Sequence, residues 1–464
     1  MLQLISFVLN SYAGPVRSVH AKKYFKITQR LSQNVVKSLL NSDRAKMLME
    51  RYNLDALLSS SRINTTYLTD FDCISHVYDR QYNVVPGSGD DYVQTYGIFT
   101  KSGRKCLILP ESMYFVSELE NNPTESKYTY GKPLSFRSGN PKFDSELESK
   151  YESRIRSGTN NFDSAPDALC AAVKNLVGTS GTMALDSNEM SQSAKNKLAS
   201  SFPNMKLKRA SELFRFIRMV KSEEEVRRLE TASRITEKSL EAIINAIKPG
   251  VREVDVRKIF VESVIAQGGT FQSVHFMIPH GSKAGTMTTP TNDTFRNNTS
   301  GWLDFGCVYM GYFSDIGESF TLGRPEEKVA KIYEALKMVI ERCEEFIRPG
   351  IKCSEINSEA AKTWERAGVE RPPTGMGHGL GLEVHEYPRI SAAKGETLRN
   401  SSGIKDDIVE SSIDIQIEEG MVLAIEAPYM QWGWGGVHVE REILVEKNGT
   451  RRLSEEPRFL RQIG

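Results

Sequence analysis

The chain has 464 residues, 39% hydrophobic and 26% charged, which is an ordinary composition for a globular protein and more chain than one hydrophobic core usually serves. Its 60 Lys and Arg residues balance 59 Asp and Glu residues, so the charge gives no reason to expect nucleic acid or an anionic membrane as a partner. No apolar stretch approaches the roughly 18 residues that span a bilayer, and six scattered cysteines without a Cys-x-x-Cys pair indicate free thiols in a reducing compartment, the cytoplasm.

Residues 1–42 are predicted to form a basic N-terminal extension. The first acidic residue is Asp43, and six Lys or Arg residues and several serines precede it. Such a segment is typical of a transit peptide, which would place the protein in the mitochondrial matrix, although its apolar and basic residues follow no clean amphipathic period. The alternative is a basic extension of a cytoplasmic protein.

Residues 43–215 alternate between strand and helix patterns, which predicts a smaller α/β domain. Short apolar runs bounded by turn residues are typical of buried strands, and two of these runs flank a glycine-containing turn that predicts a hairpin. Strands are predicted at 55–58, 96–100, 105–109 and 182–186, and a helix at 191–201. Residues 133–165 are polar and contain Gly and Ser, so they are predicted to form a long loop.

Residues 216–464 are predicted to form a second domain that begins with a long helix. Ser222 and Glu225 form a capping box, and the apolar residues that follow fall on one helical face. Pro249-Gly250 ends this helix, and a second helix follows at about 254–267.

The same layout returns one hundred residues later. The segment Ile347-Arg-Pro-Gly-Ile-Lys matches Ile247-Lys-Pro-Gly-Val-Arg, and a second helix pattern follows each copy. A matched helix–break–helix with like-charged neighbours indicates an internal duplication. We therefore expect an α+β domain built of two pseudo-equivalent halves, with a site where the halves meet.

Acidic residues and a histidine interrupt this domain where apolar strands are expected. Asp304 and Asp315 flank a glycine-containing turn, His378 lies among glycines, and Glu426 and Glu440 stand in apolar, β-rich runs. Four carboxylates facing one core would raise each other's pKa values, and burying them unpaired would be very costly. Two divalent cations per chain would neutralise them. One histidine with oxygen ligands suits Mn²⁺, Fe²⁺, Co²⁺ or Zn²⁺, and we expect manganese first.

These residues, with the segments Gly375-Met-Gly-His-Gly-Leu-Gly-Leu-Glu-Val-His and Gly-Gly-Val-His-Val-Glu, resemble the Xaa-Pro aminopeptidase, prolidase and creatinase family. The resemblance implies a duplicated pita-bread C-terminal domain preceded by a creatinase-type N-terminal domain. It also implies that Asp304 holds one ion, that His378 and Glu426 hold the other, and that Asp315 and Glu440 bridge both. It further implies a homodimer that acts on a small peptide.

The resemblance also implies the catalytic groups. A hydroxide bridging the two ions would be the nucleophile, and Glu426 would carry its proton as general base and acid. His385 matches the family's substrate-side histidine, which stabilises the tetrahedral intermediate, with a core histidine as the alternative. We add His438, which stands where the family commonly has an arginine. His76 could reach the site of a partner subunit, but a surface-loop histidine without such a role is the favoured alternative.

Other positions depart from the family pattern. The usual Ser-Asp-Ile-Thr-Arg is Ser314-Asp-Ile-Gly-Glu here, so Glu318 reverses a charge near the predicted site. A histidine usual before the first Asp ligand is missing, and His275 and His280 could replace it only by another loop path. These changes leave the predicted metal ligands intact and are expected to alter the substrate pocket.

The leading prediction is a dimetal hydrolase of the Xaa-Pro dipeptidase or aminopeptidase type. The departures keep open an enzyme of the same fold that acts on a small non-peptide substrate, as a creatinase-like C–N hydrolase or a lyase. A non-catalytic pita-bread binding module is the third possibility, and the presence of all five ligand residues argues against it.

Overall fold

The computed structural model describes residues 38–73, 94–133, 142–143, 145–186, 189–270, 276–391, 406–409, 414–453 and 460–464. Nearly all of the predicted extension 1–42 lies outside these ranges, and so do His76 and His275. Within them, no helix is both long enough and apolar enough to span a membrane.

The first half of the chain builds a seven-stranded sheet of order β5-β4-β3-β2-β1-β6-β7. The predicted hairpin is present, since β2 pairs antiparallel with β3, and the other predicted strands and helix are present within a few residues. The strands are β1 Ala56–Ser59, β2 Tyr96–Thr100, β3 Lys105–Pro110, β4 Ser126–Tyr130, β5 Asn161–Phe162, β6 Ser180–Leu185 and β7 Asn204–Arg209. The helices are α3 Ser42–Arg51, α4 Arg62–Thr69, α6 Glu111–Leu119, α7 Glu146–Ser157, α8 Ala165–Leu176, α9 Gln192–Ser201 and α10 Ser211–Arg218.

The predicted loop 133–165 is wrong in part, because it contains helix α7 and strand β5. Ser145 and Glu148 form a capping box at the start of α7, and Glu152 is its only buried residue. A helix that buries so little shows no apolar period, and its capping residues and ion pairs such as Lys150–Glu146 stabilise it instead.

The second half builds a nine-stranded sheet whose main path runs β14-β13-β15-β18-β12-β9-β8, with β19 on β18 and β20 on β12. Two-stranded ribbons, β10 with β11 and β16 with β17, accompany it. The bounds are β8 Phe276–Met277, β9 Thr299–Phe305, β10 Val308–Tyr309, β11 Tyr312–Phe313, β12 Ile316–Leu322, β13 Gly377–Gly379, β14 Glu386–Arg389, β15 Val422–Glu426, β16 Tyr429–Gln431, β17 Gly435–Val437, β18 Glu440–Glu446, β19 Gly449–Arg452 and β20 Arg461–Ile463.

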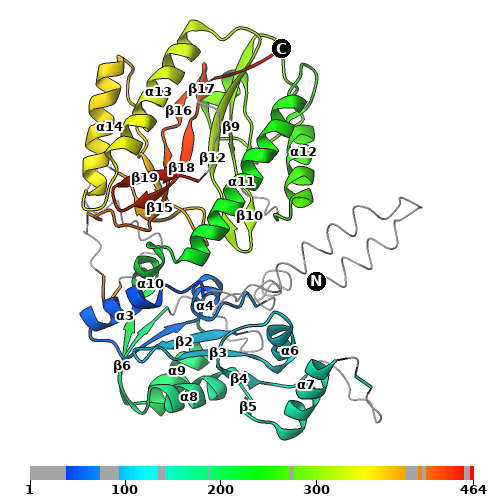
Figure 1. Cartoon of the computed structure of the whole chain (residues 1–464), viewed down its shortest axis with the longest axis vertical. Coiled ribbons are helices and arrows are strands. Elements are labelled where there is room, and N and C mark those ends of the chain that lie inside the picture. The colour runs from blue at the N-terminus through cyan, green and yellow to red at the C-terminus, as the bar shows by residue number, and fades with distance from the viewer. Residues whose placement is uncertain are drawn as a thin grey trace. The chain divides into compact units, whose positions relative to one another are not determined.

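Two helix pairs accompany this sheet and confirm the predicted duplication. The pair α11 (Glu223–Ala246) and α12 (Glu253–Ala266) and the pair α13 (Glu327–Phe346) and α14 (Cys353–Ala367) flank the strands in Figure 1. The Pro-Gly break in each pair makes the same backbone bond, from Gly250 N–H to the Phe295 carbonyl and from Gly350 N–H to the Ile417 carbonyl, both 2.9 Å long. Both glycines have positive φ, which disfavours other residues there.

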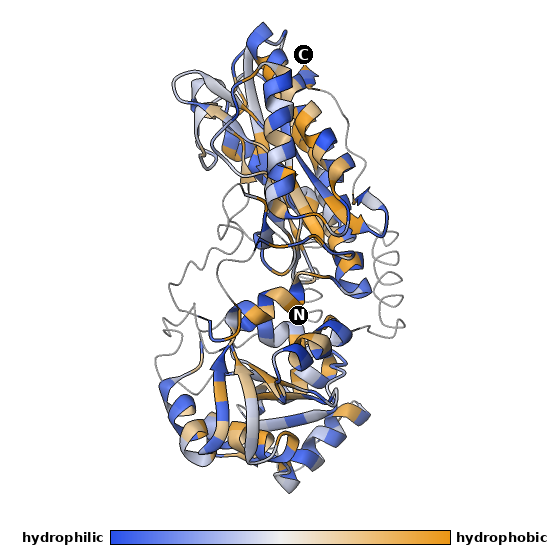
Figure 2. Cartoon of the chain, turned by 90° about the vertical axis from the view of Figure 1, so that its left-hand side faces the viewer, coloured by the Kyte–Doolittle hydropathy of each residue, from blue (hydrophilic) through white to orange (hydrophobic). Residues whose placement is uncertain are grey.

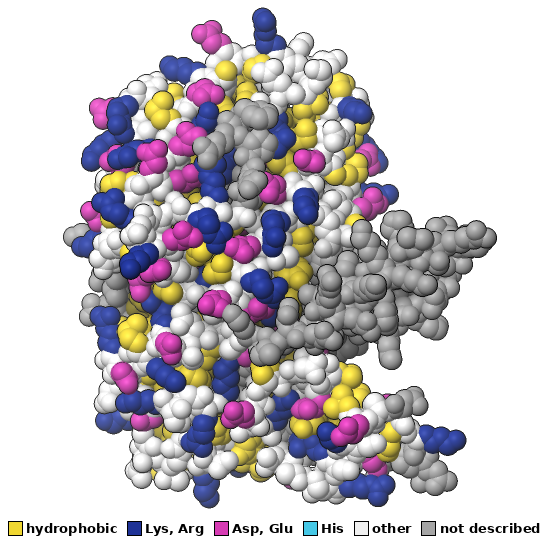
Figure 3. Space-filling view, in the orientation of Figure 1, with side chains coloured by type: hydrophobic (Ala, Val, Ile, Leu, Met, Phe, Trp, Pro, Cys, Tyr) yellow, Lys and Arg dark blue, Asp and Glu magenta, His cyan; other side chains and the backbone are white. Residues whose placement is uncertain are grey.

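The long helices α11 and α13 are amphipathic, as their periodicity predicts. In Figure 2 hydrophobic and hydrophilic residues alternate along them, and α11 buries Leu229, Leu240 and Ile243. On the face drawn in Figure 3, Lys and Arg side chains are interspersed with Asp and Glu. The helices therefore bury apolar stripes against the sheet, whose strands carry the acidic residues of the site.

Candidate metal centre

Strand register aligns three acidic residues in one row across the second sheet. Asp304 in β9 lies opposite Gly317 in β12, Gly317 lies opposite Glu440 in β18, and Glu440 lies opposite Glu426 in β15. Residues directly opposite each other on neighbouring strands point to the same face of a sheet. Three carboxylates therefore share one face, and Gly317 leaves a gap in the row between two of them.

The two remaining ligand candidates join this row. Asp315 stands two residues before Gly317 and thus on the same face. His378, in β13, places Nε2 3.5 Å from Asp315 Oδ2, 3.7 Å from Glu426 Oε1 and 3.9 Å from Glu440 Oε1. The structure thus brings together all five side chains named as ligands from the sequence.

The cluster brings four carboxylates close together, so their negative charges repel one another. The side chains of Asp315 and Glu440 are almost fully buried. Burial raises the pKa of Glu440 well above its ordinary value, and the negative charges of Asp315, Glu426 and Asp304 raise it further. Bound divalent cations would remove this conflict.

The chemistry of the donor atoms fits such cations. Glu440 Oε1 and His378 Nε2 are buried and make no hydrogen bond to any residue that the structure describes. His378 Nδ1 lies 3.0 Å from the Gly379 carbonyl oxygen, so Nδ1–H donates there and leaves the Nε2 lone pair facing the carboxylates. Burial lowers the pKa of His378, which favours the neutral imidazole that metal binding requires.

Potential ligand atoms fall into overlapping groups within 4.8 Å of one another. One group is His378, Glu426 and Glu440, and another is Asp304, His438 and Glu440. Glu440 belongs to both, so the arrangement fits two cations that share this carboxylate.

The two other catalytic candidates also lie at the cluster. His385 is exposed, and its ring centroid lies 4.0 Å from that of His378, so a buried core histidine is ruled out. His385 forms a third potential ligand group with Asp315 and His378. His438 is buried, and its Nε2 lies 3.3 Å from Glu440 Oε2.

The charge of Glu318 does not face this cluster, which corrects its expected effect on the substrate pocket. Side chains alternate along a strand, so Glu318 and Arg441, the neighbours of Gly317 and Glu440, project to the opposite face. Arg441 NH1 lies 3.3 Å from Glu318 Oε1, and both side chains are buried. The negative charge of Glu318 is therefore paired with the positive charge of Arg441, on the face of the sheet opposite the cluster.

Glu442 is a buried acid that sequence reasoning missed. It stands two residues after Glu440 and accepts a hydrogen bond of 2.6 Å from the Asp315 backbone N–H. Its negative charge also raises the pKa of Glu440. Glu442 could have been found from its position two residues after Glu440 in a β-rich run, because residues two apart on a strand point to the same face.

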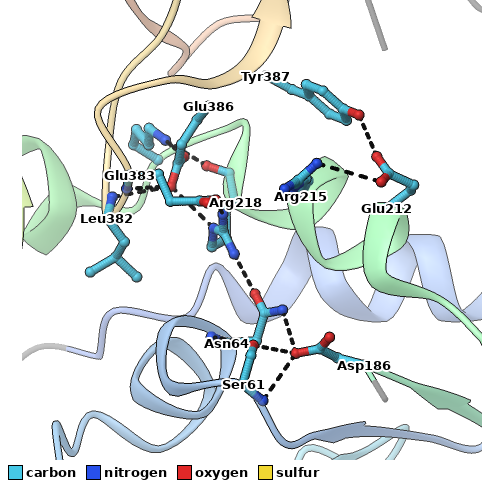
Figure 4. A network of polar contacts seen from close by, with 11 residues as sticks. Ser61, Asn64, Asp186, Glu212, Arg215, Arg218, Leu382, Glu383, Glu386 and Tyr387 are labelled. Carbon is cyan, nitrogen blue, oxygen red and sulfur yellow. Dashed lines mark hydrogen bonds and ion pairs between the residues drawn. The ribbon is translucent and has the colours of Figure 1, made fainter. Parts of the chain in front are cut away.

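A polar network missing from the sequence interpretation supports the segment that carries His385 (Figure 4). Glu386 accepts hydrogen bonds from Arg218 Nε at 3.1 Å and from Lys221 Nζ at 2.6 Å. Arg218 also donates to Glu383 and to Asn64 of α4. Burial alone would raise the pKa of Glu386, but Lys221 and Arg218 lower it below its ordinary value. The network thus holds a charged carboxylate next to His385.

His280 contacts a different group of polar residues, around Glu253. Its Nδ1 lies 3.0 Å from Glu253 Oε1, and its Nε2 lies 3.1 Å from the Thr294 carbonyl oxygen. Lys283 Nζ lies 2.6 Å from the same Glu253 oxygen. A lysine in this position already balances the carboxylate, so we assign no metal site there.

Comparison with known proteins identifies the family. The model of metallopeptidase family M24 matches residues 227–447, and the creatinase/prolidase N-terminal domain model matches residues 42–220. An Xaa-Pro dipeptidase of Pyrococcus horikoshii is 30% identical over 267 residues, which cover 54% of this chain and 67% of the relative. A second Xaa-Pro dipeptidase, from Pyrococcus furiosus, is 29% identical over 54% of this chain and 68% of the relative.

Solved structures share the fold. An Xaa-Pro dipeptidase from Bacillus anthracis superposes with a TM-score of 0.67 at 19% identity, covering 91% of this chain and 98% of that one. The prolidase from Pyrococcus horikoshii gives a TM-score of 0.64 at 23% identity, covering 90% and 100%. The predicted resemblance and fold class are confirmed. The chain therefore belongs to metallopeptidase family M24, with a creatinase/prolidase-type domain before its M24 domain.

Proposed function

We propose that this protein is a metal-dependent peptidase that hydrolyses the Xaa-Pro bond of short peptides. The observation that carries the proposal is the convergence of Asp304, Asp315, His378, Glu426 and Glu440 on one face of the sheet. Relatives named Xaa-Pro dipeptidase supply the substrate class. Family M24 implies divalent cations, and we propose two per chain, with manganese as the first candidate.

The bound cations would supply an activated water and polarise the scissile carbonyl. Glu426 is the most exposed of the four acidic ligand candidates, so an incoming substrate can reach its carboxylate. We propose that Glu426 takes the proton from the water and passes it to the leaving nitrogen. Exposed His385, whose ring centroid lies 4.0 Å from that of His378, would orient the scissile carbonyl.

The non-peptide alternative is not favoured, since the two relatives described above are both named Xaa-Pro dipeptidase. The division into residues 43–215 and 216–464 stays a proposal, which the two separate sheets support.

We also propose a cytoplasmic location. It is supported by six free cysteines, five of them buried. We further propose a homodimer, as the family resemblance implies.

The test combines metal content with a substrate panel. Protein stripped by a chelator and reloaded is expected to bind about two Mn²⁺ per chain. It should hydrolyse Ala-Pro and Gly-Pro dipeptides faster than Ala-Ala, and it should leave creatine intact. Asp315→Ala is the matched control and should lose metal. A protein that binds no divalent metal, or that cleaves creatine and no dipeptide, would overturn the proposal.

A further inference from the structure

The imidazole of His438 lies inside the acidic cluster. Its Nε2 is 3.3 Å from Glu440 Oε2 and 3.9 Å from Asp304 Oδ2, and the side chain is 1% exposed. Asp304, His438 and Glu440 form one of the groups whose ligand atoms lie within 4.8 Å of one another. An imidazole nitrogen facing two carboxylates is a common ligand arrangement for a divalent cation.

Gly317 makes room for this ring. It is the residue between Asp304 and Glu440 in the strand row, and a Cβ there would lie 2.3 Å from His438 Cδ2 and 2.4 Å from His438 Nε2. It would also lie 2.8 Å from Glu440 Cβ. Any larger residue at 317 would therefore displace the imidazole. Gly317 and His438 both depart from the family pattern, and the structure shows that the two departures fit each other.

The backbone and the neighbours of His438 hold the ring in this place. Ser319 Oγ accepts from the His438 backbone N–H at 2.9 Å and donates to the His438 carbonyl oxygen at 2.8 Å. The Trp302 ring packs edge-on, with its centroid 5.7 Å from that of His438. The backbone bonds and the Trp302 contact limit the positions that the imidazole can take, which favours ligation.

Glu440 relates this imidazole to that of His378. Its Oε1 lies 3.9 Å from His378 Nε2, and its Oε2 lies 3.3 Å from His438 Nε2. The shared carboxylate therefore presents one oxygen to each imidazole. Two cations that share Glu440 would each have one histidine within reach.

We propose that His438 is a metal ligand, which binds through Nε2 the cation that Asp304 and Glu440 hold. The proposal deepens the proposed function, because it rests on that site binding two cations. It adds a sixth ligand to the five inferred from the sequence. A nitrogen donor in place of water raises affinity for Zn²⁺ and Co²⁺ more than for Mn²⁺, so His438 should also shift metal preference.

X-ray absorption of the Zn²⁺-loaded protein tests the proposal directly, because imidazole ligands give a distinct outer-shell scattering. His438→Asn is expected to lower this scattering as much as His378→Asn does. His280→Gln, which changes a buried histidine outside the cluster, should leave it unchanged. Titration against a chromophoric chelator should show Zn²⁺ binding about 10- to 100-fold weaker at one of the two sites in His438→Asn. The loss of affinity for Mn²⁺ should be smaller.

Gly317→Ala provides a second route if His438→Asn fails to fold. It retains the histidine but displaces its ring, so it should lower the imidazole scattering by the same amount. Two bound Zn²⁺ ions with unchanged scattering in the His438→Asn or Gly317→Ala protein would overturn the assignment of His438 and leave the proposed function standing. Failure of the unmodified protein to bind Zn²⁺ or Mn²⁺ would instead overturn the proposed function, and this inference with it.

Discussion

Glu426 and Glu440 lie directly opposite each other in the register of β15 and β18, yet their side chains differ in exposure. The Glu426 side chain is 23% exposed and that of Glu440 is 1% exposed. Glu426 is the last residue of β15, and its carboxylate is the more accessible of the two. Both glutamates are ligand candidates, and the more exposed Glu426 can in addition reach a substrate for proton transfer.

Glu426→Gln is expected to keep the fold and lose at least about 10² in kcat on Ala-Pro, because the amide keeps the shape but cannot carry a proton. Glu440→Gln is the comparison, and it should lose more metal than Glu426→Gln as well as turnover, because Glu440 belongs to two ligand groups and Glu426 to one. Steady-state kinetics with excess Mn²⁺ and elemental analysis separate the two effects. Near-normal kcat in Glu426→Gln would show that this residue is not the base.

The second prediction concerns the buried ion pair between Glu318 and Arg441, on the face of the sheet opposite the acidic cluster. Glu318→Arg would place two cations side by side and should cost at least about 3 kcal/mol of unfolding free energy. The double variant Glu318→Arg with Arg441→Glu should recover most of that loss, because the pair is restored with reversed polarity. Urea unfolding of the metal-loaded proteins measures both. Equal losses in the single and double variants would contradict a paired role.

Arg218 is expected to position the segment that carries His385. Arg218→Met would leave Glu386 with one of its two buried cations, and should cost about 3–5 kcal/mol of unfolding free energy. At temperatures where the variant stays folded, kcat should fall more than KM rises, because His385 would lose its fixed position.

Arg215 on the same helix is the matched control for Arg218 (Figure 4). Its guanidinium is partly exposed, 3.5 Å from Glu212 and 5.5 Å from the centroid of the Tyr387 ring, so Arg215→Met should cost less unfolding free energy than Arg218→Met. Thermal unfolding and dipeptide kinetics on both variants provide the readouts. Equal effects at the two arginines would argue against a specific role for Arg218.

The raised pKa of Glu225 should make the unfolding free energy depend on pH. Burial raises the pKa of Glu225 from 4.5 to about 8, Glu386 adds to the rise, and Lys221 opposes it. The folded protein therefore keeps a proton that the unfolded chain releases near pH 4.5. Its stabilising contribution is complete below that pH and is lost as pH rises to about 8, with a slope of at most about 1.4 kcal/mol per pH unit.

Glu225→Gln should remove this slope. Unfolding free energies of both proteins at pH 5, 6.5 and 8, measured with chelator present, should diverge in favour of the variant as pH rises. The chelator keeps metal binding from contributing its own pH dependence. Parallel curves for the two proteins would mean that Glu225 titrates near its ordinary pKa.

Local patterns allowed much of the fold to be predicted. Strands such as Ala56–Ser59, the capping box at Ser222 and the Pro-Gly breaks of the duplicated helix pairs depend on neighbouring residues, which the sequence displays. Helix α7 was missed because it buries almost nothing, so its stabilising ion pairs leave no apolar period.

The sequence by itself determined which residue types are available for metal binding, because acids inside apolar strands are costly unless something neutralises them. Only the tertiary structure decided where each side chain points. Gly317 lies between Asp304 and Glu440, and Glu318 faces away, because pairing among β9, β12 and β18 sets the register, and a shift of one residue would exchange the two faces. The contact of Arg218 with Glu386 likewise joins residues 168 positions apart, and no local pattern encodes such a contact.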